Sequence, residues 1–303
     1  MKKQEKGHAP RYKATFGGVL FDVIKWIILI VFVIVTLYPV LNTLAVSLND
    51  GLDTIRGGIY LIPRKFTWQN YQTVLRKDSL KIATVVTISR TVIGTVTQLF
   101  VTAMLSYILS RKDFVLKKFM TILYVLTMYV NAGLIPGYLL IKNLGLLNSF
   151  WVYIIPGMVS AFNMIVIRTF MNGIPESLAE SAEVDGAGHM RIFIQIILPL
   201  CKPVLATIAL FIAVGQWNSW FDAMLYNSFN ENLTTLQYEL MKLLSSVSSQ
   251  SGNIDALKNT GSMVTPMSVR AATTIVTSIP IICLYPFLQR YFVAGLTIGG
   301  VKE

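Results

Sequence analysis

Between two long apolar segments lies the stretch Glu180-Ser181-Ala182-Glu183-Val184-Asp185-Gly186-Ala187, and Ile196-Ile197-Leu198-Pro199 follows it. The polar connection spans residues 172–202, although a few residues suffice to join neighbouring membrane helices. Fixing the backbone of such a loop costs about 1 kcal/mol per residue in conformational entropy, so something must hold it. We therefore expect this loop to dock onto a soluble partner.

The local pattern of the loop predicts a helix, a glycine turn and a second helix at the membrane face. A proline at the first turn and glutamates near the N-terminal end favour one short helix over residues 176–184. Gly186 and Gly188 then allow the chain to reverse at positive φ. An apolar helical run follows, and Pro199 and Pro203 bend its entry into the bilayer. A capped re-entry helix with no partner is the alternative that the residues leave open.

The composition of the 303-residue chain places it in a membrane. Apolar types make up 54% of the residues and charged types 14%, and the mean hydropathy is +0.60. A soluble domain carries about 25% charged residues. The net charge of +11 does not indicate nucleic-acid binding, because the basic residues sit beside apolar runs and not on one face interleaved with aromatics. Such residues set membrane topology and attract anionic lipid headgroups.

Six segments are long and apolar enough to cross a bilayer, for which a helix needs about 20 residues. They are residues 26–48, 83–109, 119–141, 150–170, 203–225 and 271–292. The third is interrupted by Asn131, Gly133, Pro136 and Gly137, and two interpretations stay open: these residues open the helix around a substrate path, or they only bend it against a neighbour. We therefore predict an all-α integral membrane protein with six transmembrane helices. Its parts are a basic N-terminus (1–25), a six-span domain (26–294) and a C-terminal tail (295–303).

Basic residues are more frequent in the segments on the side of the membrane that holds the N-terminus than in those on the other side. Because cytoplasmic loops carry the excess of Lys and Arg, we expect both termini in the cytoplasm. The loop over 172–202 then also faces the cytoplasm, and the segments 49–79 and 226–269 lie outside. The first apolar run is too long for the core of a cleaved signal peptide, so we expect a retained span.

The loop resembles the EAA loop of permease subunits of bacterial ABC importers, in which it forms a coupling helix seated in a cleft of the cytoplasmic ATPase subunit. The matching positions are Glu180, Ser181, Ala182, Gly186, Ile196, Leu198 and Pro199, with Ser181 in place of the first alanine of the motif. Together with Glu183, Asp185 and Ala187 of the same loop, they are the candidate ATPase-coupling residues.

Further motifs resemble carbohydrate permeases of the maltose-permease type. These are Asn163, Arg168, Ile174-Pro175 and the segments 107–111, 295–297 and 299–302; the segments 133–138 and 217–222 resemble the branch that imports longer or acidic oligosaccharides. The resemblance implies a type I ABC-importer permease fold, a second permease subunit, two ATPase subunits that bind ATP and Mg, and an extracytoplasmic solute-binding protein. It also implies a location in a bacterial plasma membrane and a tail that inserts between the ATPase subunits.

Sugars bind to aromatic faces and to hydrogen-bonding amides and carboxylates. The candidates for a substrate path are Tyr129, Asn131, Asn163, Trp217, Asn218, Trp220 and Asp222. Asn218 and Asp222 are four residues apart and can share one helix face. The alternative for these residues is an interfacial aromatic belt with hydrogen bonds between helices. Arg90 has three candidate roles, pairing with Asp222, pairing with an acidic sugar, and snorkelling to the outer interface; we expect snorkelling.

No catalytic or metal site is expected. The chain lacks a phosphate-cradling glycine loop with a lysine, so we do not expect it to bind ATP itself. Cys201 and Cys283 lack the spacing of metal ligands. Two other classes stay as alternatives. An ion-coupled secondary transporter would need carboxylates in mid-membrane, which are almost absent here. A non-transporting membrane scaffold would not need a polar fifth span.

Overall fold

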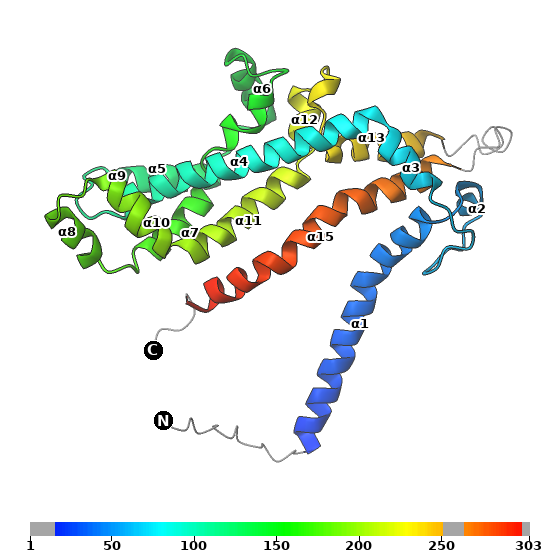
Figure 1. Cartoon of the computed structure of the whole chain (residues 1–303), viewed down its shortest axis with the longest axis horizontal. Helices are drawn as coiled ribbons and strands as arrows, with labels where there is room; N and C mark the ends of the chain where they lie inside the picture. The colour runs from blue at the N-terminus through cyan, green and yellow to red at the C-terminus, as the bar shows by residue number, and fades with distance from the viewer. Residues whose placement is uncertain (1–15, 251–263, 299–303) are drawn as a thin grey trace.

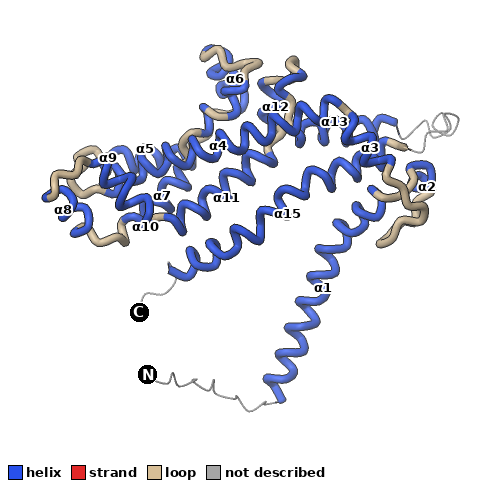
Figure 2. The backbone as a smooth tube through the Cα atoms, in the orientation of Figure 1, coloured by secondary structure: helices blue, strands red, loops and turns tan. Residues whose placement is uncertain are grey.

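The computed structural model describes residues 16–250 and 264–298 of the chain. Over these ranges the chain is helical, as predicted, and no sheet forms; Asn49 and Phe66 make one isolated antiparallel bridge (Figure 2). The first 15 residues of the predicted N-terminal segment and the last five of the predicted tail lie outside the described residues, as does 251–263 of the segment 226–269.

Three helices within the described residues are long and apolar enough to cross a membrane. They are α1 (Phe16–Ser47), α4 (Asp78–Ser110) and α15 (Pro266–Ile298), in which Pro266–Cys283 is the candidate span. Helix α1 begins ten residues before the predicted first span, and α15 continues into the start of the predicted tail.

Two bent helix pairs are also long and apolar enough when each pair is counted as one span, so the described residues contain between three and five candidate spans. In the first pair, η1 (Phe150–Tyr153) and η2 (Ile155–Gly157) precede α7 (Ala161–Met171) at an angle of 48°. In the second, α9 (His189–Ile192), η3 (Phe193–Ile197) and α10 (Leu198–Leu200) precede α11 (Lys202–Asn218) at 85°.

The predicted third span, 119–141, is not one helix, which is why the structure does not confirm six. Helix α5 (Lys117–Tyr129) ends, and α6 (Leu134–Asn143) begins only after a break. At the break Gly133 has φ +89°, a conformation that glycine adopts without strain, and its N–H donates to Asn131 Oδ1 at 2.9 Å. Neither half is long enough to span a bilayer by itself.

Helix α4 packs against α7 and α11, and α15 packs between α11 and α1 (Figure 1). The main core joins α4, α7, η3 and α11 through buried side chains that include Tyr107, Ile167, Phe193 and Ile208. Helix α1 diverges from this bundle, and only Ala45, Val46 and Ser47 of its residues are buried. Its remaining apolar length is therefore free to contact lipid or another subunit.

Short helices gather at the two ends of α4 (Figure 1). At its N-terminal end lie α2 (Gly51–Ile55), α3 (Gln69–Arg76) and α13 (Leu236–Gln250), and at its C-terminal end lies α8 (Ser177–Val184). Helix α12 (Phe221–Tyr226) and η4 (Glu231–Leu233) connect α11 to α13. The described parts of the two predicted outside segments thus lie at one end of the bundle and the predicted docking loop at the other.

Candidate coupling helix and polar cavity

Helix α8 forms where the loop pattern predicted it and ends in a Schellman motif. The N–H of Gly186 donates to the carbonyl of Glu183 at 3.0 Å, and the N–H of Ala187 donates to that of Ala182 at 2.9 Å. Gly186 has φ +79°, which this motif requires of the residue after the helix cap. The prediction for Gly188 was wrong, because its φ is −72° and it precedes the first turn of α9.

One face of α8 is fixed to the bundle and the other is free. Ala179 is buried, and Ala182 and Ala187 pack against the main core. Ile196 and Leu198, on the following helical run, pack against the same core. The opposite face carries the exposed residues Glu180, Ser181, Val184 and Asp185, and Val184 is 88% exposed. The helix is therefore a rigid projection whose polar rim and one apolar side chain are available to a partner.

Ion pairs connect α8 to the end of α4. Arg111, directly after α4, places Nη2 2.6 Å from Glu183 Oε1, and Lys112 pairs with Glu176. Partial burial opposes the charge on Arg111, but Tyr107 and Glu183 outweigh it, so the pKa of Arg111 is raised. The hydrogen bond to Glu176 raises the pKa of Lys112. Two ion pairs therefore connect α8 to the residues that directly follow α4.

The chain that follows α8 enters the bundle through a sharp bend. Helix α10 ends at Leu200 and α11 begins at Lys202, with an angle of 85° across the break. Pro199 and Pro203 flank the bend, as predicted, and neither has an N–H to continue the hydrogen-bond ladder. The segment before α11 therefore lies across the end of the bundle and not along it.

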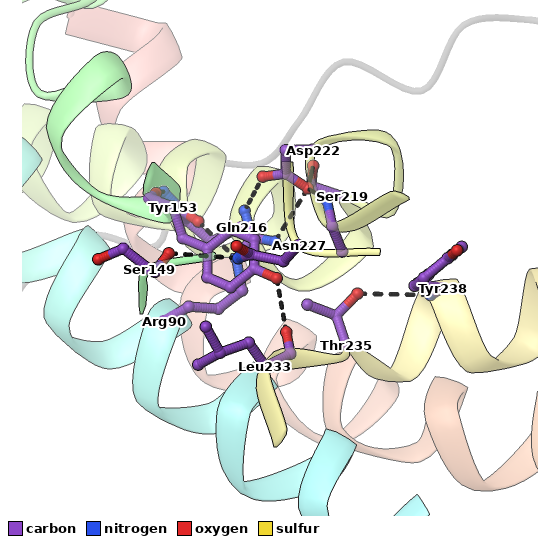
Figure 3. Close-up of polar contacts among 11 residues, drawn as sticks. Arg90, Ser149, Tyr153, Gln216, Ser219, Asp222, Asn227, Leu233, Thr235 and Tyr238 are labelled. Carbon is purple, nitrogen blue, oxygen red and sulfur yellow. Dashed lines mark hydrogen bonds and ion pairs between the residues drawn. The ribbon is translucent and has the colours of Figure 1, made fainter. Parts of the chain in front are cut away.

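A buried polar cluster lies in the middle of α4, and Arg90 is its centre (Figure 3). Its guanidinium makes a two-pronged contact with Asp222, with Nη1 to Oδ1 at 3.1 Å and Nη2 to Oδ2 at 2.6 Å. Nε donates to Gln216 Oε1 at 3.0 Å, and the group lies 4.3 Å from the centre of the Tyr153 ring. The expected snorkelling is wrong, because the Arg90 side chain is 2% exposed and Asp222 on α12 neutralises it inside the protein.

The partners of Arg90 are themselves held in place. Asp222 Oδ1 accepts hydrogen bonds from the Ser219 hydroxyl at 2.8 Å and the Ala223 N–H at 2.9 Å, and Gln216 Nε2 donates to the Tyr153 carbonyl at 3.3 Å. Gly94 leaves the room for Gln216, because a Cβ at position 94 would lie 2.9 Å from Gln216 Nε2. The cluster is thus a neutralised, hydrogen-bonded unit.

A cavity of about 550 Å³ opens beside this cluster. Its lining includes Arg90, Gln98, Asn163, Phe211, Asp222 and Tyr226. Polar amides, one ion pair and aromatic faces are the groups that a sugar contacts. Among the candidates from the sequence, the cavity brings together Asn163 and Asp222. Gln98 and Gln216 were not among the predicted site residues. Their position inside apolar spans could have indicated them, because polar side chains there usually face a cavity or another helix.

The other substrate-path candidates lie elsewhere. Trp217 is buried against α15 and donates Nε1–H to the Thr277 carbonyl at 3.0 Å. Tyr129 and Asn131 are exposed at the break between α5 and α6, and Trp220 packs edge-to-face on Phe221. The expected shared face of Asn218 and Asp222 is wrong: α11 ends at Asn218 and Asp222 belongs to α12, so the two are not on one helix.

The comparisons with known proteins agree with this architecture. Residues 99–298 match the family described as "Binding-protein-dependent transport system inner membrane component". The chain is 34% identical to the polygalacturonan/rhamnogalacturonan transport system permease protein YtcP of Bacillus subtilis, over 93% of this chain and 98% of that one. It is 29% identical to the galactooligosaccharides transport system permease protein GanQ of the same organism, over 92% and 94%.

A solved structure is similar over nearly the whole chain. A chain in the crystal structure of a bacterial ABC transporter involved in the import of the acidic polysaccharide alginate superimposes with a TM-score of 0.85 at 30% identity, covering 94% of this chain and 100% of that one. The all-helical fold is therefore that of an ABC-importer permease, a transport component and not the ATPase. The chain belongs to the inner-membrane permease components of binding-protein-dependent ABC transport systems.

Proposed function

We propose that this chain is one of two permease subunits of an ATP-driven importer that translocates an oligosaccharide delivered by an extracytoplasmic binding protein. The observation that carries the coupling part of the proposal is the geometry of α8. It is a short helix, closed at Gly186, pinned to the core on one face and exposed on the other. The names of relatives that transport polygalacturonan, galactooligosaccharides and alginate support the substrate class.

In the proposed mechanism α8 is the coupling helix and occupies a cleft of a partner ATPase subunit. ATP and Mg bind to the partners, and closure of the ATPase pair displaces α8. The displacement reaches α4 through the Arg111–Glu183 ion pair and reaches α11 through the segment with the 85° bend. Because both routes end in long packed helices, the expected response is a rigid-body rotation of the bundle that alternates access to the cavity.

We also propose six spans, with α5 and α6 together forming a broken third span. Irregular backbone inside a membrane is tolerated where protein or an aqueous cavity surrounds it, which suits the break at Gly133. In this proposal residues 1–25 form the basic N-terminus, 26–294 the six-span domain and 295–303 the C-terminal tail. Helix α8 lies at the opposite end of α4 from α2, α3 and α13. This supports a cytoplasmic 172–202 loop and termini, and outer segments 49–79 and 226–269 that face the binding protein.

The cavity beside Arg90 is the proposed sugar path, with Asn163 and Asp222 as contacts and Gln98 and Tyr226 added by the structure. Arg90 is not available to an acidic sugar while Asp222 neutralises it. The exposed apolar length of α1 supports a second permease subunit as a neighbour in the membrane.

The test of the coupling role is binding-protein-stimulated ATP hydrolysis and uptake of labelled oligosaccharide by the assembled complex in proteoliposomes. Gly186→Asp and Glu180→Lys are expected to leave insertion intact and to abolish both activities. Gly145→Asp is the matched control, because Gly145 also closes a helix at positive φ (+67°), with nothing within 4 Å of its would-be Cβ, and lies after α6. Wild-type transport by the Gly186 and Glu180 variants would contradict the coupling role.

A further inference from the structure

A second, basic cavity of about 510 Å³ lies beside the junction of α4, α5 and α7. Four cationic side chains line this basic recess: Lys112, Lys117, Lys118 and Arg168. Thr121 supplies a hydroxyl, and the rest of its lining is apolar, so no carboxylate borders the recess. Like charges this close together disfavour one another's charged form unless a counter-ion is near.

The described part of the chain neutralises the positive charge of the recess only in part. Lys112 directs its ammonium to Glu176, but no carboxylate of residues 16–250 and 264–298 lies within 4 Å of the cations of Lys117, Lys118 or Arg168. Lys117 Nζ donates to two carbonyls at the end of α4, that of Ser110, its last residue, at 3.1 Å and that of Arg111, which follows it, at 3.2 Å.

Arg168 is the incompletely satisfied member of the recess. Its Nη1 donates to Thr121 Oγ1 at 2.7 Å, and its Nε is buried without a hydrogen-bond partner among the described residues. Most buried donors in proteins have a hydrogen-bond acceptor, so this N–H calls for an explanation, and an anion bound in the recess would supply one. The planar guanidinium offers several parallel N–H donors, a geometry that matches the oxygens of a phosphate group.

The recess lies where the bilayer surface is expected. Helix α4 ends at Ser110 and α7 ends at Met171, and both belong to candidate spans. Apolar side chains beside the cations point outward: Val115 is 94% exposed, Phe119 63% and Ile122 50%. Cations next to exposed apolar groups suit a ligand with an anionic head and hydrocarbon chains.

We propose that the basic recess binds the phosphate group of an anionic phospholipid, with Arg168 and Lys118 as its principal contacts. A soluble phosphate would satisfy the cations but would leave Val115, Phe119 and Ile122 exposed. A phospholipid covers both features, so the lipid is the occupant that the surface favours. Because the recess is next to α5 and α7, the bound lipid would hold the first half of the broken helix pair α5–α6 against the bundle. The proposal does not depend on the transported substrate or on the role of α8.

The test is a lipid titration of the assembled, detergent-purified complex followed by native mass spectrometry. The probes are phosphatidylglycerol and phosphatidylcholine with identical acyl chains, and inorganic phosphate as competitor. Removing one basic residue, as in Lys118→Gln or Arg168→Gln, is expected to weaken phosphatidylglycerol binding about 5-fold. Phosphatidylcholine binding and the control Lys142→Gln, an exposed cation on α6, are expected to be unchanged.

Arg168→Lys, which keeps the charge and loses the planar fork, is expected to fall between Arg168→Gln and the wild type. If Arg168→Gln fails to assemble, Lys118→Gln decides, because its side chain is exposed. Equal phosphatidylglycerol binding by Lys118→Gln, Lys142→Gln and the wild type would overturn the proposal. Displacement of the lipid by millimolar inorganic phosphate would also overturn it, by identifying a soluble-anion site.

Discussion

Removing the carboxylate of Asp222 is predicted to destabilise the bundle strongly. The Arg90 side chain is 2% exposed and that of Asp222 is 23% exposed, so Asp222→Ala leaves a buried cation without its counter-ion. Breaking a buried ion pair on one side costs about 3–5 kcal/mol. Gln216 and the face of Tyr153 still contact the guanidinium, and Asp222 is partly hydrated. We therefore expect a loss of about 2–3 kcal/mol.

The double variant Arg90→Met/Asp222→Ala separates the ion pair from simple loss of packing. With neither charge present, no cation is stranded, and a side chain of similar length fills the space. We expect this variant to be less destabilised than Asp222→Ala alone, within about 1–2 kcal/mol of the wild type. A gain in stability when Arg90→Met is added to Asp222→Ala would be informative, because a second mutation in the same core ordinarily lowers stability further.

The assay is the thermal unfolding midpoint of the assembled complex in detergent, followed by size-exclusion chromatography with fluorescence detection. Asp222→Ala is expected to lower the midpoint by on the order of 5 °C, and the double variant is expected to recover part of that loss. Glu231→Ala, which removes an exposed carboxylate near α12, is the control. If Asp222→Ala behaves like Glu231→Ala, or if the double variant is the least stable, the buried-charge reasoning is refuted.

Three further predictions concern the two ends of the bundle. Gly186→Ala should destabilise the end of α8 by about 1 kcal/mol and should reduce stimulated ATP hydrolysis more than Gly186→Asn does. The space around Gly186 is open, so the positive φ is the only obstacle to a side chain, and asparagine adopts that conformation more readily than alanine. Equal effects of the two substitutions would contradict this. Glu183→Arg should lower stimulated ATP hydrolysis, and adding Arg111→Glu in the same chain should restore it by reversing the ion pair. If the double variant is no more active than Glu183→Arg alone, the ion pair does not contribute to coupling. Burial alone would raise the pKa of Glu239, but its hydrogen bond with Lys242 and the nearby cations lower it below the ordinary 4.5. Its stabilisation is therefore present above that value and is lost as pH falls through the lower folded pKa. In Glu239→Gln, the thermal unfolding midpoint should therefore fall less steeply with decreasing pH in this acidic range than it does in the wild type. An unchanged pH dependence would refute the stabilising role of the Glu239 carboxylate.

The parts of the site that follow local rules were predictable from the sequence. The short helix α8, the positive φ of Gly186 and the bend flanked by Pro199 and Pro203 each depend on a few neighbouring residues. Glycine and proline restrict the backbone in ways that hold in nearly any context. Gly188 shows the limit of that reasoning, because a glycine permits positive φ but does not require it.

The parts that depend on distant contacts were not predictable in the same way. Arg90 and Asp222 are separated by 132 residues, and hydropathy does not encode which polar groups meet across a bundle. The break after Asn218 placed Asp222 on a new helix and so brought it to Arg90, yet no proline or glycine marks that break. In 119–141 the glycines and the proline left two outcomes open, a helix that opens and a helix that only bends, and the structure shows a break at Gly133.

The role of α8 is tested most directly by cysteine crosslinking in membranes. Val184→Cys places a thiol on the exposed face of α8, and Cys283 is replaced by alanine because it is the exposed native thiol, whereas Cys201 is buried. Phe229→Cys, 94% exposed between α12 and η4, is the control. We predict that Val184→Cys crosslinks to the ATPase subunit with a yield that changes with ATP, and that Phe229→Cys does not crosslink to it. An assembled complex in which Val184→Cys gives no crosslink, with or without ATP, would contradict the coupling role of α8.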